Sequence, residues 1–403
     1  MMKWGRRLLV AAVAVATPAV GAIAQDEPIK IGAVYIMSGP FSANGEFARN
    51  GIDLAVEEIN ESGGILGRDV EFKVKDSAAK ANVAIQSIRS LVLEDKVDVL
   101  MGLDSSGVAR SVLPLMRHLK KPFMVTHAGT PDVTGQSCND WVFRNSLNVM
   151  QNMRAAADLA KELGGTRWTT IGPDYAYGYQ TWEFFQSYLT EINPDVAFLE
   201  PNFPQFRAKN FKPFINKVME QNPDGVMLSL WGGDLINFVP QAAALGFFDQ
   251  DFEVLVTLGA AIDVLDTLGD KMPEGVWLST RYWFDGLHHT RNTEFVNAYE
   301  AKFGDVPSYN SQNAYTAVYA YKQAMEAAGT TEAKAVTAAL SGMEISAPVG
   351  TFTFREADHQ AVLDAFWGKT AAMDANGLRT LDPLNIIPGE SIIPSAEETG
   401  CTR

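Results

Sequence analysis

The sequence predicts an α/β protein made of two similar lobes, each with a parallel sheet between helices. Strand patterns alternate with helix patterns over residues 30–126, and short connections between such elements favour a parallel sheet. The same alternation starts again over residues 149–279. The two halves also share an order of features, because residues 97–116 and 223–242 each run from an apolar strand through small or acidic residues into a helix.

The first half begins with an apolar strand at residues 30–37 and the loop SGPFSANG. In the helix that follows, Ala48, Ile52, Ala55 and Ile59 fall on one face. After a turn at 63–68, the expected elements are, in order, a strand at 69–76, a helix at 80–94, a strand at 98–101, a helix at 106–119 and a strand at 122–126.

The second half repeats this alternation and then changes character. Its expected elements are a helix at 149–163, a strand at 167–172, a helix at 177–189, a strand at 195–200, a helix at 211–221, a strand at 225–230, a helix at 233–245 and strands at 253–257 and 275–279. Three further helices are expected at 292–304, 310–329 and 330–342. Residues 349–354 and 361–370 are predicted to pair as a hairpin. The Pro-rich chain from residue 380 is predicted to be irregular.

Residues 1–24 have the pattern of a signal peptide. Three basic residues precede the apolar run 8–20, and the small-x-small sequence Ala22-Ile23-Ala24 marks a cleavage point. The alternative is a membrane anchor, but the apolar run is short for a bilayer. We therefore expect a cleaved leader and an exported protein that begins at Gln25.

Charge and cysteine content limit which partners the protein can bind and indicate whether its cysteines form a disulfide. The chain has a formal net charge of −15 and no basic cluster after the leader, so we expect no binding to nucleic acid or to anionic lipid. Cys138 and Cys401 are the only cysteines. In an exported protein an isolated pair favours a disulfide, with two free thiols or a metal site as alternatives. Neither cysteine has a histidine or second cysteine at ligand spacing, so we expect no metal.

The sequence offers little for catalysis. The patterns GxGxxG, GxxxxGK[ST], GxSxG and HExxH are all absent, so we expect neither an enzyme nor a bound cofactor. His127 follows a predicted strand and could line a cleft. Aromatic residues also lie at predicted strand ends or crossover loops, namely Tyr175, Tyr177, Trp231, Tyr282, Trp283 and Phe284. Together they favour an apolar clamp around a small organic ligand.

Several segments resemble one known family in the same order along the chain. IKIGAVYIMSGPFSANGEFARNGIDLAVEEINESGGILGRDVEF, VDVLMGLDSSGVARSVLP, KPFMVTHAGTPDVTG, DYAYGYQTWEFF and SYNSQNAYTAVYAYKQAMEAAG resemble the type I periplasmic solute-binding proteins, in their leucine/isoleucine/valine-binding branch. The resemblance covers essentially the whole mature chain. It implies a periplasmic, monomeric protein that captures a small solute and delivers it to the permease and ATPase subunits of an ABC importer.

The resemblance also implies how the chain is divided. It implies two Rossmann-like lobes with parallel sheets, joined by three crossover strands near residues 144–149, 279–284 and 344–350. The expected division is a first lobe from 25–145 and 282–345, a second lobe from 146–281 and 346–385, and an irregular tail from 386–403. Two other functions stay open, an exported sensor that signals to a receptor and an exported α/β enzyme.

The residues that match the family's ligand contacts come from both lobes. The resemblance implies ligand contacts at Ser38, Phe41, Ser105, Ser106, Ala128, Thr130, Tyr177, Trp231, Gly259 and Tyr282. In the amino-acid binders of the family the serine and threonine residues hold the ligand carboxylate, and an acidic residue holds the ammonium. That acidic position falls here at Gly259 or Ala260, with Asp263 nearby in a helix pattern. Because an unpaired buried ammonium is costly, amides, urea-like solutes and aromatic or short carboxylates fit better than a standard α-amino acid.

Overall fold

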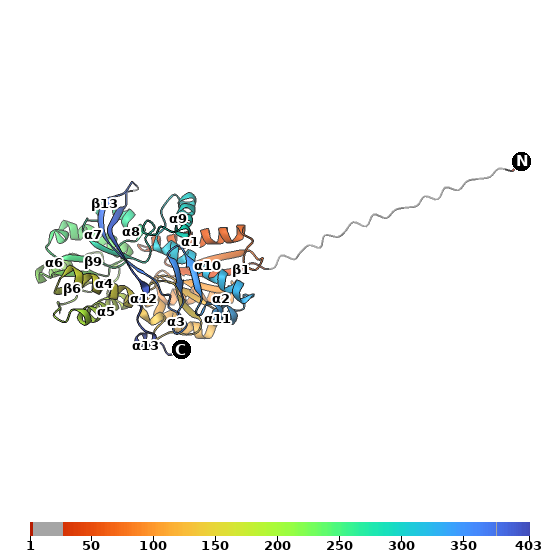
Figure 1. The fold of residues 1–403 in the computed structure, drawn as a ribbon, viewed down its shortest axis with the longest axis horizontal. Coiled ribbons are helices and arrows are strands. Elements are labelled where there is room, and N and C mark those ends of the chain that lie inside the picture. The colour runs from red at the N-terminus through yellow and green to blue at the C-terminus, as the bar shows by residue number, and fades with distance from the viewer. Residues whose placement is uncertain (3–26, 376) are drawn as a thin grey trace.

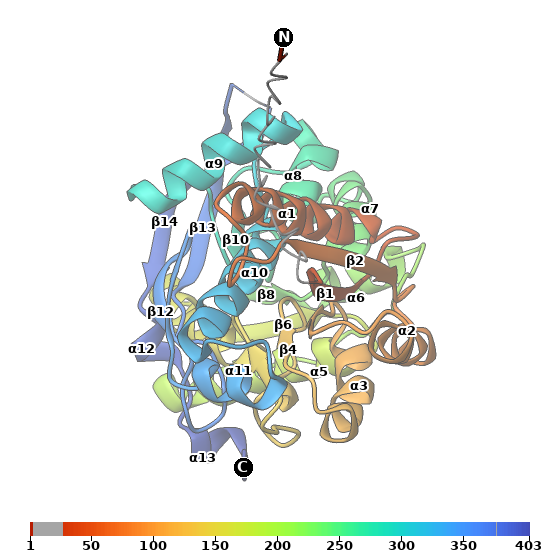
Figure 2. The same cartoon turned by 90° about the vertical axis from the view of Figure 1, so that its right-hand side faces the viewer.

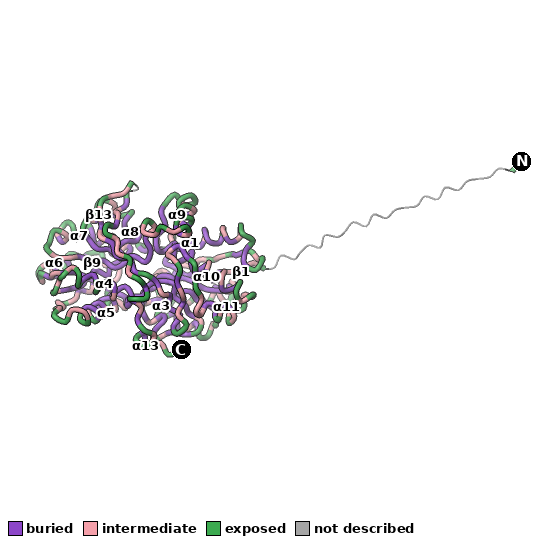
Figure 3. Tube along the Cα trace, viewed as in Figure 1, coloured by how far each residue is buried: buried purple, intermediate pink, exposed green. Residues whose placement is uncertain are grey.

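The chain folds into two lobes that lie side by side (Figure 1). This computed structural model describes residues 1–2, 27–375 and 377–403. All of the expected leader except its first two residues lies outside the described residues, so its cleavage stays a prediction. Each lobe has its own sheet with helices on its faces. Buried residues run through the strands and the helix faces that cover them, whereas exposed residues form the outer loops (Figure 3).

The sheet of the first lobe is parallel throughout, as predicted. Its order in the described chain is β2-β1-β3-β4-β5. The strands are β1 (Ile29–Tyr35), β2 (Val70–Asp76), β3 (Val99–Gly102), β4 (Phe123–Val125) and β5 (Val142–Arg144). The connecting helices are α1 (Ser42–Glu61), α2 (Ala81–Leu93) and α3 (Ser106–Leu119).

Helices from late in the sequence complete the first lobe. They are α9 (Thr290–Phe303), α10 (Tyr309–Ala328) and α11 (Ala333–Leu340). Helix α10 packs along α1 and beside α11 (Figure 2). Most of α10 is buried, which explains why its sequence is rich in alanine and tyrosine rather than amphipathic.

The sheet of the second lobe is mixed, whereas the sequence predicted a parallel sheet in each lobe. Its order in the described chain is β14-β13-β10-β9-β8-β6-β7, parallel from β7 to β10 and antiparallel at β13 and β14. The strands are β6 (Arg167–Ile171), β7 (Ala197–Phe198), β8 (Gly225–Leu228), β9 (Glu253–Val256), β10 (Trp277–Thr280), β13 (Ala365–Met373) and β14 (Arg379–Ile387). The helices are α4 (Val149–Leu163), α5 (Ala176–Ile192), α6 (Lys212–Gln221), α7 (Gly232–Ala244) and α8 (Ile262–Leu268). Short 3₁₀ turns are η2 (Phe247–Asp249) and η3 (Gly269–Lys271) in this lobe and η1 (Pro131–Val133) in the first lobe.

Of two sequence-based expectations about the last part of the chain, one was wrong and the other holds only at a single bridge. Phe354 and Ala361 form an isolated antiparallel bridge, but the expected hairpin of paired strands is not formed. The strand β12 (Gly350–Thr353) pairs with β11 (Glu344–Ala347), whereas β13 pairs with β10 and β14. The chain after residue 380 is not irregular, because β14 occupies most of its first part. Pro383 suggested a loop, but β14 is the last strand of its sheet, and an edge strand tolerates a proline.

Up to the end of β14, the described chain passes between the lobes three times, and the C-terminal segment later crosses once more. The first two passages follow β5 and β10, as the resemblance implied. The third lies between β12 and β13, at residues 354–364, and not at 344–350. This passage runs along the first one, because Arg144 N–H donates to the His359 carbonyl at 3.1 Å and Ala361 N–H donates to the Arg144 carbonyl at 3.0 Å. The two passages therefore form one joined hinge. The lobe boundaries given above remain a prediction.

The C-terminal segment crosses from one lobe to the other. It contains α12 (Gly389–Ile392) and α13 (Ala396–Thr399). The predicted disulfide between Cys138 and Cys401 is confirmed, with the sulfurs 2.07 Å apart, and it ties the segment to the first lobe. Glu398 on α13 meets the second lobe, accepting from Arg154 Nη2 on α4 at 3.0 Å and from the Tyr188 hydroxyl on α5 at 2.9 Å. We call residues 396–403 the tail strap.

Within the described residues, no helix is long and apolar enough to cross a membrane.

Candidate functional site

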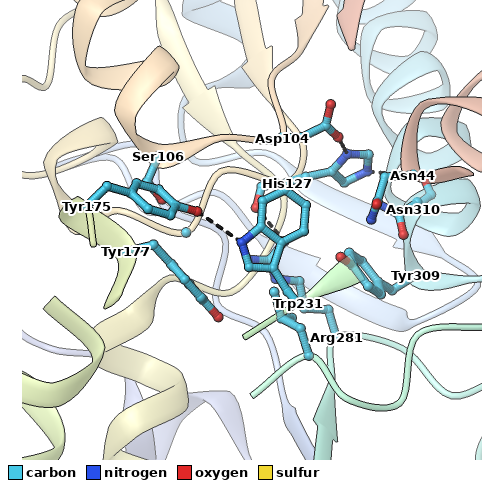
Figure 4. A pocket seen from close by; sticks show the side chains of 12 residues that line it. Asn44, Asp104, Ser106, His127, Tyr175, Tyr177, Trp231, Arg281, Tyr309 and Asn310 are labelled. Carbon is cyan, nitrogen blue, oxygen red and sulfur yellow. Dashed lines mark hydrogen bonds and ion pairs between the residues drawn. The ribbon is translucent and has the colours of Figure 1, made fainter. Parts of the chain in front are cut away.

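A cavity lies between the lobes, at the carboxyl ends of strands from both sheets (Figure 4). We call it the interlobe cavity, and it is lined by Asn44, Asp104, Ser106, His127, Gly129, Tyr175, Tyr177, Trp231, Leu258, Arg281, Tyr309 and Asn310. Most of these residues follow directly after β3, β4, β6, β8, β9 or β10. The cavity has a volume of about 10 Å³, roughly the room that one water needs. A solute larger than water can therefore enter only when the lobes move apart.

One wall of the interlobe cavity is aromatic, and its rings are held in place. Trp231 Nε1 donates to the Tyr175 hydroxyl at 3.0 Å, and the Tyr177 hydroxyl lies 2.9 Å from Thr257 Oγ1. Burial raises the pKa of Tyr177. Phe41, from the first lobe, packs behind Trp231 with the ring centroids 4.5 Å apart. These contacts fix flat apolar surfaces that suit an organic solute.

The opposite wall carries a buried histidine and a buried carboxylate in direct contact. His127 Nδ1 lies 2.8 Å from Asp104 Oδ1, and both side chains are 2% exposed. His127 Nε2 lies 3.2 Å from the carbonyl oxygen of Asn310 at the start of α10. Both ring nitrogens therefore face oxygen atoms, and the ring and the Asp104 carboxylate hold each other in place.

Arg281 enters the interlobe cavity from the second passage between the lobes. It is 7% exposed, and its Nη1 donates to the His127 carbonyl. Its guanidinium lies over the Tyr309 ring, 5.4 Å from the centroid. Burial lowers the pKa of Arg281, yet a guanidinium keeps its proton in proteins. The site thus contains a buried positive charge close to aromatic rings.

Gly129 makes the approach of Arg281 possible. A Cβ atom at this position would lie 3.2 Å from Arg281 Nη2 and 3.1 Å from Tyr177 Cε2. Both distances are tighter than ordinary van der Waals contact, so any side chain here would push Arg281 or Tyr177 away. The glycine of the sequence HAG, directly after β4, therefore helps to place the charge.

The structure brings three of the residues implied by the resemblance into the cavity lining. These are Ser106, Tyr177 and Trp231, and Phe41 packs against Trp231. Ser106 Oγ accepts from the Thr130 N–H at 3.1 Å, which leaves its own proton free to be donated.

Six other implied residues lie outside the lining. Ser105, Ala128 and Thr130 are buried beside it, and Thr130 Oγ1 accepts from the Asp132 N–H at 3.4 Å at the start of η1. Gly259 is packed against Leu278, the Tyr282 hydroxyl donates to Asn292 Oδ1 at 2.6 Å, and Ser38 is exposed. Ligand contacts at these six residues remain a prediction.

Several lining residues were not identified from the sequence as ligand contacts. Asp104 and Leu258 follow predicted strands and carried no distinguishing pattern. Asn44, Tyr309 and Asn310 lie near helix starts that only the fold brings to this cavity. Arg281 did carry a signal, because it is the single charged residue in the run from Val276 to Phe284. A charge inside an apolar run, directly after a strand, is a useful indicator of a site.

Comparison with known proteins identifies the class. The chain belongs to the periplasmic binding protein family, whose sequence profile matches residues 28–373. This confirms the predicted fold class and the predicted function in solute binding.

Individual relatives agree with this assignment. The chain is 25% identical over 352 residues to Leu/Ile/Val-binding protein homolog 7 of Brucella suis, covering 83% of this chain and 86% of that protein. The structure of an amino acid ABC transporter substrate-binding protein from Pseudomonas fluorescens Pf-5 matches with a TM-score of 0.83 and 25% identity, covering 94% and 99% of the two chains. A solute-binding protein of Rhodopseudomonas palustris BisB5, in complex with 3,4-dihydroxybenzoic acid, has the same fold, with a TM-score of 0.80 and 24% identity over 90% of this chain and 96% of that one.

Proposed function

We propose that this protein is the solute-capturing component of an ABC importer. In the periplasm it closes on one small organic solute and delivers it to the permease and ATPase subunits in the membrane. The observation that carries the proposal is the interlobe cavity, which draws its lining from both lobes and from a passage between them. A ligand that touches both lobes stabilises the closed arrangement, and release requires opening.

Contacts between the lobes support a closing movement. Gln180 Nε2 on α5 donates to Asp132 Oδ1 of the first lobe at 3.2 Å. Arg207 Nη2, from the loop before α6, donates to the Ala78 carbonyl after β2 at 3.3 Å. Such polar contacts at the edge of the interface are individually weak. They can therefore form on closing and break again on opening.

Catalysis is not supported by the geometry of the polar wall. Ser106, His127 and Asp104 all line the interlobe cavity, which raises the question of a hydrolytic triad. A nucleophile needs the free nitrogen of the histidine as its base. Here that nitrogen faces the Asn310 carbonyl, and Ser106 Oγ accepts from a backbone N–H instead. We propose binding without chemical turnover, by a monomer that has no nucleic acid partner.

The test combines native mass spectrometry with small-angle scattering. Protein purified from the periplasm is expected to carry a small molecule, which native mass spectrometry identifies. After the solute is removed and returned, we expect the radius of gyration to fall on its return. An unchanged radius at saturation would contradict the closing movement, and conversion of the solute into a product would favour the exported enzyme.

A further inference from the structure

We propose that Arg281 binds the carboxylate of the solute, and that the interlobe cavity takes aromatic monocarboxylates rather than α-amino acids. This inference rests on the proposed function and names the class of solute.

The charged residues that line the cavity favour an anionic ligand. The Asp104 carboxylate is already bonded to His127 Nδ1 at 2.8 Å, so it is not free to pair with another group. Arg281 forms no salt bridge with any described residue. Asp104 acts on Arg281 electrostatically, but it bonds to His127 and not to the guanidinium. A buried cation without a direct partner is costly, and a ligand carboxylate would supply that partner.

The donors of Arg281 fit a carboxylate in number and position. The structure gives the guanidinium one hydrogen bond, to the His127 carbonyl. A guanidinium has five N–H donors, and two of them on one edge can hold both oxygens of a carboxylate. Ser106 lines the same cavity and can donate its hydroxyl proton, since its oxygen already accepts from Thr130 N–H. Arginine and serine would thus face one anionic group from different elements.

The remaining surfaces of the cavity favour a flat ring. The rings of Tyr175, Tyr177, Trp231 and Tyr309 all line it, and Figure 4 shows them around the same space as Arg281. Aromatic rings prefer offset or edge-to-face contact with another ring. Once the lobes have moved apart enough to admit a solute, a carboxylate held by Arg281 would place an attached aromatic ring among these four side chains.

The same charged residues disfavour an α-amino acid. Asp104 is the one acidic residue in the lining of the interlobe cavity, and its carboxylate is already bonded to His127. The ammonium group of an α-amino acid would lie near Arg281, and no carboxylate in the lining would be left to pair with it. Like charges in a buried site repel strongly, so the site discriminates by charge as well as by shape.

The test is a binding panel measured by titration calorimetry. The acids are benzoate, 4-hydroxybenzoate and 3,4-dihydroxybenzoate, and the comparison solutes are benzamide and leucine. We expect at least one acid to bind, and benzamide and leucine to bind at least about ten-fold more weakly than that acid. Arg281→Gln should weaken binding of the acid by roughly 100-fold, because charge-assisted hydrogen bonds are lost.

Two further variants make the result specific. Arg291→Gln is the matched control, since Arg291 lies over the Tyr315 ring at 5.5 Å but outside the cavity lining, and it should leave affinity unchanged. Gly129→Ala keeps Arg281 but crowds it, so it should also weaken binding of the acid. This second variant tests the proposal even if Arg281→Gln folds poorly.

The outcomes separate this inference from the proposed function. Any one of three results would overturn the inference. Benzamide or leucine could bind as tightly as the acid, or none of the three acids could bind. The third result is that Arg281→Gln and Gly129→Ala both leave the affinity for the acid within about two-fold of the wild type. Tight binding of an acid without a fall in the radius of gyration would instead count against the closing movement and leave the assignment of Arg281 intact.

Discussion

Asp263 is a buried carboxylate near the start of α8, and it is 5% exposed. Its Oδ1 atom has no hydrogen-bond partner among the described residues. Burial raises the pKa of Asp263 from 3.8 to about 6, an effect that its backbone hydrogen bonds oppose only in part. The folded protein therefore favours the protonated form of this side chain more than the unfolded chain does.

This shift predicts how stability depends on pH. Because the folded pKa is the higher one, the stabilisation is complete below about pH 4 and is lost as the pH rises through about 6. The free energy of unfolding changes by on the order of 3 kcal/mol across this pH range. We expect Asp263→Asn to raise the melting temperature at pH 8 and to leave it unchanged at pH 4. Calorimetric melting across this range is the measurement.

A neighbouring residue provides the control for this prediction. Asp266 lies on the same helix and is exposed, so Asp266→Asn should leave the pH profile of the wild type unaltered. If Asp263→Asn shows the same pH profile as the wild type, the buried carboxylate does not control it.

Residue roles could be predicted only in part from the sequence. Ser106, Tyr177 and Trp231 follow strands of parallel sheets, and this local rule places them at the cavity. Thr130 obeys the same rule, yet its side chain points to its own turn, where it accepts the Asp132 N–H. Whether a strand-end side chain faces the cavity depends on rotamer and loop geometry, which a pattern of residue types does not contain.

The tail strap is an element held by one covalent bond and a few polar contacts. The bond between Cys138 and Cys401 closes a loop with a sequence separation of 263 residues, for which chain entropy predicts a stabilisation of roughly 3–5 kcal/mol. We expect Cys401→Ser to lower the melting temperature clearly under non-reducing conditions. Mass spectrometry of the wild type from the periplasm should show the bond.

A second variant separates the bond from the contact with the second lobe. Glu398→Gln keeps the disulfide but weakens the interactions with Arg154 and Tyr188, which are partly exposed. It should cost about 1 kcal/mol or less. If Cys401→Ser melts like the wild type, the disulfide contributes nothing to stability.

Elements with strong periodicity were predicted closely. The expected helices at 106–119 and 149–163 coincide with α3 and α4, because each has a regular apolar face. Strand β14 was missed, since Pro383 reads locally as a strand breaker. The pairing of β13 was missed because its partner β10 lies about 90 residues earlier, and sequence separation of that size leaves no local signal.

At the scale of the whole molecule, two backbone segments from different lobes lie in close contact. Gly233 on α7 faces Pro40, which follows β1 in the other lobe. A Cβ atom at Gly233 would lie 2.4 Å from the Pro40 carbonyl oxygen. Such a contact is impossible without movement, so a side chain here blocks full closure but need not disturb either lobe by itself.

This contact predicts a variant that binds poorly and folds well. We expect Gly233→Ala to weaken solute binding about ten-fold or more, while the melting temperature without solute stays close to that of the wild type. Gly107→Ala is the matched control, because its Cβ atom would meet Tyr175 Cδ2 at an ordinary 3.8 Å. Scattering on the solute-saturated variant should show a larger radius of gyration than the wild type. Equal radii and equal affinities would show that this contact does not limit closure.

Strands β13 and β14 are synthesised after all the other strands of the second sheet. The second sheet receives its last two strands from residues 365–387, after the chain has left that lobe and returned. Until then β10 is an unpaired edge whose residues are buried in the finished protein. Exposed edges of this kind pair readily with other chains. In a molecule that is still being synthesised, β10 therefore offers an edge to which other chains can pair, and the arrival of β13 covers that edge.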